Sequence, residues 1–244
     1  MSQLLLGVGR EQPLVVAGAP GSSLLTALVA YWKLEEASGS RADALGGSPL
    51  TDNNTVTTAA GKQAQAALCT AANSEYLSLA SNAAVQMGDI DFTVAAWVYL
   101  NSAKNMSLVA KDSNAASSRD YTLDYETAFT RFRFYINGSV IAAEAGGRSL
   151  ATWYLVVGWH DATANTVNVQ VNNGTVALAN TGGAVPNLSS AEFRIGARFY
   201  AANEDYSDAR IDEVGLWKAV LTPTQRTNLY AAGAGVTYPF TGVP

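Results

Sequence analysis

The fold of this 244-residue chain is decided near its end, in the stretch DARIDEVGLWKAVLTPTQRTNLYAAG of residues 208–233. The run from Ile211 to Trp217 is rich in residues that favour β-strands. Thr222 is suited to cap a helix that begins at Pro223, because the N–H that proline lacks has no partner in the first helical turn. Gly233 is expected at the left-handed position that follows the helix. The stretch therefore predicts a strand, a turn and one short helix.

Upstream of this stretch, apolar and polar residues alternate in short runs separated by turn residues. In residues 131–136, alternation places Phe132, Phe134 and Ile136 toward a core, and Arg131, Arg133 and Tyr135 outward. Asn137-Gly138 then predicts a tight hairpin, because a type I′ turn needs positive φ at both central positions. About a dozen such strands with one late helix predict an all-β antiparallel β-sandwich, in which the last strand returns beside the first.

The composition excludes several classes of protein. Hydrophobic residues make up 48% of the chain and charged residues 14%, which is typical of a globular protein with a sizeable core. The net charge is −5 and no basic patch is present, so nucleic-acid binding is not expected. The single cysteine, Cys69, lies in an apolar run and is expected to be a buried, inert thiol.

The N-terminal segment reads as a separate arm. Residues 1–26 contain two short apolar pieces, 4–8 and 14–17, separated by proline and glycine. The arm is either flexible or docked on a neighbouring subunit, and its apolar content favours docking. It lacks the basic start of a signal peptide, and no segment reaches the length of a membrane helix. We expect a protein made in a cytoplasm, with an anchoring arm (1–26), one domain (27–244) and no membrane insertion.

Several segments together resemble the laminin G-like, concanavalin A-like jelly rolls, a type found in many secreted and phage proteins. The matching segments are Tyr31–Gly39 with Asp43, Phe92–Val98, Trp153 with His160-Asp161, Val169–Gly174, Arg194–Gly196, and Ile211–Trp217 with Leu221-Thr222. Their order fits roughly residues 27–235, so the resemblance implies a jelly-roll sandwich. It implies no single function, because this fold hosts lectins, hydrolases and adhesion modules.

A glycoside hydrolase of this fold would need paired carboxylates on one strand face. The nearest match is Asp124-Tyr-Glu126, but Thr122 stands where the family has its nucleophile. The only histidine, His160, adjoins Asp161, so the two side chains of a continuing strand would point to opposite faces. We therefore expect a protein that is not an enzyme.

No cofactor is expected from the residues alone. The resemblance adds the alternative of a structural Ca²⁺, with oxygen ligands from Glu35, Asp43 and Asp212. The alternative interpretation concerns Asp212 and Glu213, which lie in an otherwise apolar strand: one caps loop amides near Glu35 or Asp43, because a buried carboxylate needs partners, and the other faces solvent.

Glycan binding usually combines an exposed aromatic face with amide or charged groups. The segment from Arg198 to Tyr206 offers this chemistry, and the outward face of residues 131–136 adds a second source. The candidate ligand-binding residues are Phe199, Tyr200, Asn203, Tyr206, Tyr135 and Arg133. Each aromatic has the alternative role of a packing or interface residue.

These observations favour a non-enzymatic virion structural protein of a phage, such as a capsid decoration, head-fibre or tail-associated module. Its jelly roll would be exposed for adhesion or glycan binding. The expected partners are further copies of the chain, capsid or other virion proteins contacted through the arm, and a cell-surface glycan. The alternative is a carbohydrate-binding lectin or adhesin without a virion role, and a glycoside hydrolase is the least favoured hypothesis.

Overall fold

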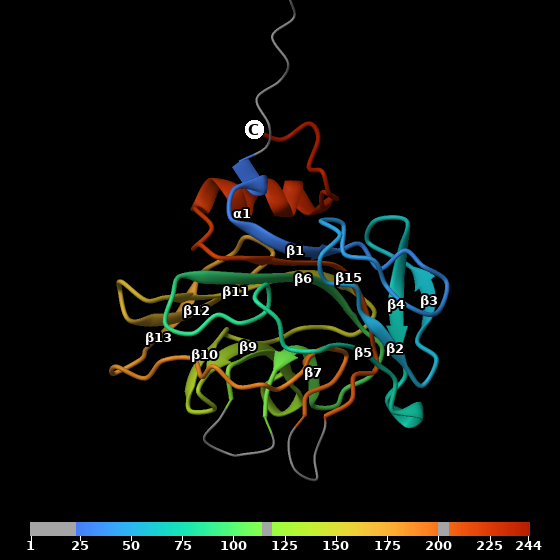
Figure 1. Cartoon of the computed structure of the whole chain (residues 1–244), viewed down its shortest axis with the longest axis horizontal. Helices are drawn as coiled ribbons and strands as arrows, with labels where there is room; N and C mark the ends of the chain where they lie inside the picture. The colour runs from blue at the N-terminus through green and yellow to red at the C-terminus, as the bar shows by residue number, and fades with distance from the viewer. Residues whose placement is uncertain (1–22, 114–118, 200–204) are drawn as a thin grey trace, which may run out of the picture.

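The computed structural model describes residues 23–113, 119–199 and 205–244. In these residues two antiparallel β-sheets lie face to face (Figure 1). The back sheet has eight strands, in the order β13-β12-β11-β6-β15-β4-β3 with β1 paired to β15. The front sheet has seven, in the order β10-β9-β8-β7-β14-β5-β2. The predicted all-β antiparallel sandwich is confirmed.

The back sheet comprises β1 (Leu28–Trp32), β3 (Thr57–Ala60), β4 (Gln65–Cys69), β6 (Phe92–Leu100), β11 (Trp153–Asp161), β12 (Thr166–Val171), β13 (Ala177–Asn180) and β15 (Ala209–Trp217). The front sheet comprises β2 (Thr51–Asn53), β5 (Tyr76–Leu79), β7 (Met106–Lys111), β8 (Tyr121–Glu126), β9 (Arg131–Ile136), β10 (Val140–Ala143) and β14 (Phe193–Ile195). The helical elements of the described residues are α1 (Pro223–Tyr230) and the 3₁₀ turns Ser23–Leu25, Ala71–Asn73, Thr127–Phe129 and Ala231–Gly233. None of these helices is long and apolar enough to cross a lipid bilayer.

β15 is an inner strand of the back sheet that changes partner along one of its sides. Residues 209–211 pair with β4, whereas residues 214–217 pair with β1. Its other side pairs with β6, with a register shift between Asp212 and Gly215. Glu213, within this bulge, has a φ of +50°, in the left-handed region that a regular strand never uses. The bulge thus places Asp212 and Glu213 at the junction where β4 gives way to β1.

The outer face of the back sheet is covered by the two ends of the described chain (Figure 1). A second apolar cluster lies there, made of Leu24, Tyr31, Ala95, Trp97, Leu155, Val157, Trp159, Trp217, Leu221, Leu229 and Phe240. The indole N–H of Trp217 donates to the carbonyl of Leu24 at 2.7 Å. Leu24 falls within the predicted arm, yet it is fully buried, so the packed domain includes residues that the sequence assigned to the arm.

The C-terminal helix begins as predicted and ends earlier. Thr222 accepts a hydrogen bond from the Gln225 backbone, and the Gln225 side chain accepts one from the Thr222 backbone, which completes a capping box. Gly233 has a positive φ of +90°, as expected, but the residue that caps α1 is Ala231, with a φ of +46°. The predicted place of Gly233 directly after the helix was wrong, because the helix ends at Tyr230 and a 3₁₀ turn follows it.

The front sheet presents polar side chains on its outer face. Phe132, Phe134 and Ile136 are fully buried between the sheets, as the alternation predicted. Asn137 and Gly138 have φ values of +51° and +66°, so the predicted tight turn is confirmed. The outer face of this sheet is the part of the sandwich where functional side chains can gather.

Cys69 is a fully buried thiol, as the sequence predicted. Burial raises its pKa to about 12. Little thiolate is present at neutral pH, so the residue acts as a small apolar side chain.

Both acids of the β15 bulge are buried, so the expectation that one of them faces solvent was wrong, and among the described residues no cationic side chain is hydrogen-bonded to them. Asp212 Oδ2 accepts the backbone N–H groups of Lys62 and Gln63 at 2.7 and 2.9 Å, and Glu213 Oε2 accepts the Tyr31 hydroxyl. Burial, with the two negative charges so close, raises the pKa of Asp212 to about 8, and burial raises that of Glu213 to about 7. The fold therefore favours the protonated form of both acids.

This burial predicts that the protein loses stability as pH rises. Both pKa values lie above the unfolded values of about 4, so the folded chain binds more protons than the unfolded chain between those limits. The contribution is complete below about pH 4 and is lost as pH rises through about 7 and 8. Asp212→Asn should flatten the decline between about pH 4 and 8, and Glu213→Gln should flatten it between about pH 4 and 7, in guanidinium unfolding in EDTA-containing buffer at a series of pH values.

A wild-type free energy of unfolding that rises with pH across this window would contradict the buried protonated pair. If the free energy of unfolding of Asp212→Asn changed with pH in parallel with that of the wild type, the raised pKa of Asp212 would be contradicted.

Candidate functional site

The outward side chains of β8 and β9 stand opposite one another on the front sheet. The register pairs Thr122 with Tyr135, Asp124 with Arg133, and Glu126 with Arg131. The residues between them, including Leu123 and Phe134, point into the core. Each carboxylate of β8 therefore faces a guanidinium of β9 across the strand pair.

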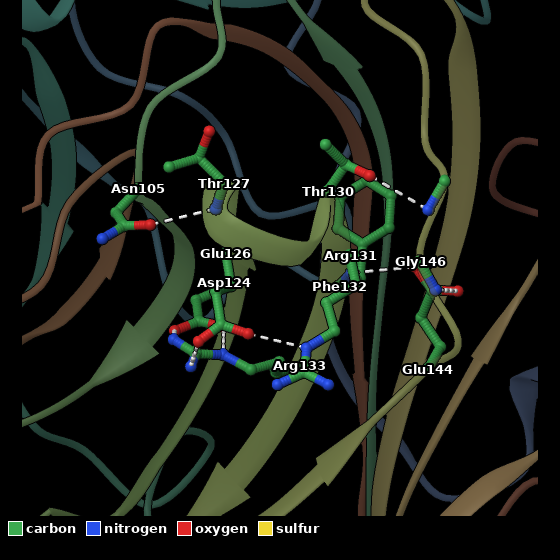
Figure 2. A network of polar contacts seen from close by, with 11 residues as sticks. Asn105, Asp124, Glu126, Thr127, Thr130, Arg131, Phe132, Arg133, Glu144 and Gly146 are labelled. Carbon is green, nitrogen blue, oxygen red and sulfur yellow. Dashed lines mark hydrogen bonds and ion pairs between the residues drawn. The ribbon is translucent and has the colours of Figure 1, made fainter.

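Arg133 binds both carboxylates of β8 (Figure 2). Its Nε and Nη2 donate to the two oxygens of Asp124 at 2.9 and 2.6 Å, and its Nη1 donates to Glu126 at 2.6 Å. Glu126 also accepts from Arg131 Nε at 2.6 Å. Burial raises the pKa of Asp124, and the hydrogen bonds from Arg133 oppose that shift. This bidentate bonding fixes the plane of the Arg133 guanidinium relative to the plane of the Asp124 carboxylate.

This network bears directly on the hypothesis of a hydrolase. A retaining glycosidase needs one carboxylate free to attack the sugar and another able to deliver a proton. Asp124 and Glu126 share the guanidinium of Arg133. Thr122, on the same strand, is buried and has no carboxylate. His160 lies on β11 in the other sheet, with its ring nitrogens 3.3 Å from Asp89 Oδ1 and from the Thr166 carbonyl. Asp124 and Glu126 are thus members of one ion-pair network with Arg131 and Arg133.

A pocket of about 370 Å³ opens beside β14 on the same side of the sandwich. It is lined by Ser113, Ser189, Ser190, Ala191, Glu192, Arg194 and Phe199. Phe193 and Ile195 are fully buried in the core, so Arg194 between them points outward. Its Nε donates to Glu192 Oε2 at 3.1 Å, and its guanidinium lies 4.9 Å from the centre of the Phe199 ring. The Phe199 side chain remains 39% exposed, so the pocket combines an aromatic surface with a charged pair.

Four of the predicted ligand-binding residues lie on or beside this face. Phe199 lines the pocket, and the Tyr206 ring packs 6.0 Å from Tyr76, whose ring lies 4.3 Å from the Arg194 guanidinium. Arg133 belongs to the network described above. Tyr200 and Asn203 lie outside the described residues.

Tyr135 faces outward as predicted, but it is only 3% exposed. Its hydroxyl accepts a hydrogen bond from Arg198 Nη1 at 3.2 Å, and Arg198 Nη2 pairs with Asp205 at 2.6 Å. The segment around Arg198 thus lies over Tyr135, so this ring serves as an anchor and its face is closed to a sugar.

The sequence analysis missed Glu192 and Arg194 as site residues. The signal was available, because alternation in the segment Glu192–Gly196 places both on the side opposite the core residue Phe193. The serines at 189 and 190 carried no such signal, since they belong to no periodic run.

The three predicted calcium ligands bind backbone amides of two regions, Asp43 near its own loop and Glu35 and Asp212 at the turn of residues 62–65. Asp43 accepts the N–H groups of Tyr31, Leu45 and Gly47 at 3.0, 3.0 and 3.1 Å. Glu35 accepts the N–H of Gln65 at 2.9 Å, and Asp212 accepts those of Lys62 and Gln63. In the part of the chain that the structure describes, no three acids, histidines or cysteines are grouped as a metal site. The set Glu35, Asp43 and Asp212 does not fit a calcium ion, which needs six or more converging oxygens.

Comparison with known proteins places the fold. A model of the concanavalin A-like lectin/glucanases superfamily matches residues 71–225, more than half of the chain. A search of curated proteins finds no match. Among solved structures, a sialidase of Trypanosoma rangeli superposes with a TM-score of 0.63 at 15% identity, over 86% of this chain and 33% of the sialidase. The binding domain of Paraclostridial Mosquitocidal Protein 1 gives 0.61 at 12%, over 80% and 50%.

Domain 4 of AbnA, an extracellular arabinanase of Geobacillus stearothermophilus solved with arabinotriose, gives a TM-score of 0.59 at 16% identity. The alignment covers 86% of this chain and 98% of that domain. The chain thus spans a third of the sialidase and half of the mosquitocidal binding domain, and at these identities the likeness concerns the fold alone. On the match of the family model, the chain belongs to the concanavalin A-like lectin/glucanases superfamily.

Proposed function

We propose that the chain is a non-catalytic carbohydrate-binding domain that holds a sugar in the pocket at Phe199. One observation carries the proposal: an exposed aromatic ring and an Arg194–Glu192 pair line the same pocket. A sugar ring has an apolar C–H face that packs on an aromatic ring, and hydroxyls that bond to charged groups at its edge. The complex of the AbnA domain with arabinotriose supports the proposal by analogy of fold.

The charges around the pocket favour an uncharged sugar. Arg194 and Glu192 are paired, and the charges of the nearby network are also paired, as Arg133 with Asp124 and Arg198 with Asp205. A ligand carboxylate would have to compete with protein carboxylates for each of these guanidiniums. Hydroxyl groups can add to such pairs without displacing them.

A second pocket, of about 620 Å³, is less suited to a sugar. It is lined by Ala143, Glu144, Ala145, Arg148, Val171, Asn172, Gly174, Thr175, Val176 and Ala177, among which there is no aromatic ring. The Glu144 carboxylate already accepts from the backbone of Phe132 and Gly146 and twice from Arg148. This pocket is larger, but the carboxylate of Glu144 in its lining already accepts four hydrogen bonds from the protein.

The absence of catalysis is part of this proposal. The carboxylates of the front sheet that resemble a hydrolase pair, Asp124 and Glu126, are both paired with Arg133, and Glu126 is also paired with Arg131. Removing either acid should therefore disturb the fold of the face and not a reaction. Release of reducing sugar from any oligosaccharide by the wild type, lost on Glu126→Gln, would overturn this part.

Phe199→Ala should weaken binding of neutral oligosaccharides by about tenfold. A stacked aromatic contributes about 0.5–1.5 kcal/mol beyond the area it buries, and about 1.4 kcal/mol is a factor of ten in Kd. The measurement is calorimetric titration with a panel of soluble neutral oligosaccharides that includes arabinotriose. The matched control is Leu178→Ala on β13 of the back sheet, which removes a side chain that is 65% exposed.

The proposal fails if no member of the panel binds the wild type, or if Phe199→Ala and Leu178→Ala bind equally well. Tighter binding of sialic or uronic acids than of neutral sugars would instead contradict the choice of an uncharged ligand.

Display on a virion is the finer part of the proposal, and it rests on the sequence of residues 1–26. The apolar pieces at 4–8 and 14–17 suit docking on a further copy of the chain or on a capsid protein. We expect the full chain to sediment as an assembly and a chain that begins at Ser23 to sediment as a monomer, with unchanged sugar affinity. This truncation keeps Leu24, which is part of the second apolar cluster.

Equal sedimentation of the two chains would contradict a role of the arm in assembly. Absence of the protein from purified particles of a phage that encodes it would remove the virion role and leave the carbohydrate-binding domain standing.

A further inference from the structure

Two aromatic rings stand out on the described surface. Phe129 is 60% exposed and Phe199 is 39% exposed, and every other exposed large apolar side chain of the described residues is aliphatic. Leaving a phenyl ring in water forgoes the free energy that its burial would release. Two phenyl rings that stay exposed, while the other phenylalanines of the described residues are buried, are therefore informative.

Both rings lie against an arginine that is paired with a glutamate. The Phe129 ring centre is 4.3 Å from the Arg131 guanidinium, and Arg131 Nε donates to Glu126 Oε2 at 2.6 Å. At Phe199 the corresponding contacts are 4.9 Å to Arg194 and 3.1 Å from Arg194 Nε to Glu192 Oε2. The same three residue types, with the same donor and acceptor atoms, occur twice.

The turn that carries Phe129 is held from both sides (Figure 2). Asn105 accepts the N–H of Thr127 at 3.0 Å, and the hydroxyl of Thr130, a residue with a φ of +47°, accepts the N–H of Gly147 at 3.0 Å. A Cβ on Gly146 would lie 2.3 Å from the Phe129 carbonyl, which shows how closely the next segment packs on the turn. Phe129 is thus an exposed ring on a fixed support, as a binding platform needs to be.

We infer that Phe129, Arg131 and Glu126 form a second sugar subsite, so that one glycan chain spans the front sheet and engages both rings. The inference rests on the proposed function. In the strand order, β9 and β14 are separated by β8 and β7, which is about 14 Å across the sheet at the usual strand spacing. A monosaccharide cannot bridge that distance, whereas an oligosaccharide can. Arg133, partly exposed between the two subsites, offers guanidinium edges to the intervening sugars.

Two linked subsites make affinity depend on chain length. Once one ring holds a sugar, the second contact is intramolecular and raises the affinity of a chain that reaches both. Phe129→Ala should weaken binding of the longest oligosaccharides of one neutral series by about tenfold and leave the monosaccharide of that series within about twofold. Phe199→Ala should weaken every member of the series, and Phe129→Trp should retain the preference for long chains.

The matched control is Ile141→Ala on β10, a residue 42% exposed that stands opposite Tyr135 in the register. A purely structural role for Phe129 would lower the melting temperature of Phe129→Ala and leave the Kd for every chain length unchanged, and that result would overturn the second subsite. Binding of the monosaccharide that needs Phe199, with no gain for longer chains, would overturn it too while the proposed function stands. A series in which no member binds the wild type would instead overturn the proposed function.

Discussion

The change of partner along β15 is the constraint on which the rest of the structure depends. A single strand must pair with β6 along one side while serving first β4 and then β1 along the other. The bulge at residues 212–215 makes this possible, because extra residues on one strand increase its local twist and change its direction. Asp212 holds the amides that lead into β4, and Glu213 holds the hydroxyl of Tyr31 in β1. The two adjacent acids thus tie together segments from both ends of the chain.

Tyr31 extends this tie to the outer layer. Its ring packs edge-on against Trp217 and Phe240, at 6.4 and 5.1 Å between centres. Helix α1 is fixed next to them by Arg226, which donates to Gln170 at 2.7 Å and lies 4.3 Å from the Trp159 ring. Because this layer closes the outer face of the back sheet, polar recognition is left to the front sheet. The location of the candidate site is therefore a consequence of how the chain ends pack.

The acids of the two faces illustrate how environment decides the state of a carboxyl group. Asp212 and Glu213 have backbone amides and a hydroxyl as partners, and burial moves their pKa values into the neutral range. Glu144 shows the opposite case, since the hydrogen bonds from Arg148 and two backbone amides outweigh burial and lower its pKa. Under the closed face the two acids are thus bound by neutral backbone and hydroxyl donors. At the open face Asp124, Glu126 and Glu144 are each paired with an arginine.

Sequence patterns could predict the alternation of β9, the hairpin at Asn137-Gly138 and the cap at Thr222, because each depends on residues a few positions apart. They could not predict that Arg198 would bury Tyr135, since those residues are 63 positions apart and meet only through the packing of the sheet. For the same reason the sequence could not show which backbone amides the three acids expected at a calcium ion would bind. Asp43 binds the amide of Tyr31, whereas Glu35 and Asp212 bind amides of the turn at residues 62–65. Local periodicity fixes which face a side chain occupies, and only the tertiary structure decides what covers it. The repeated phenylalanine–arginine–glutamate grouping is of this second kind, because Glu126 precedes its arginine by five positions and Glu192 by two, and no spacing in the sequence relates them.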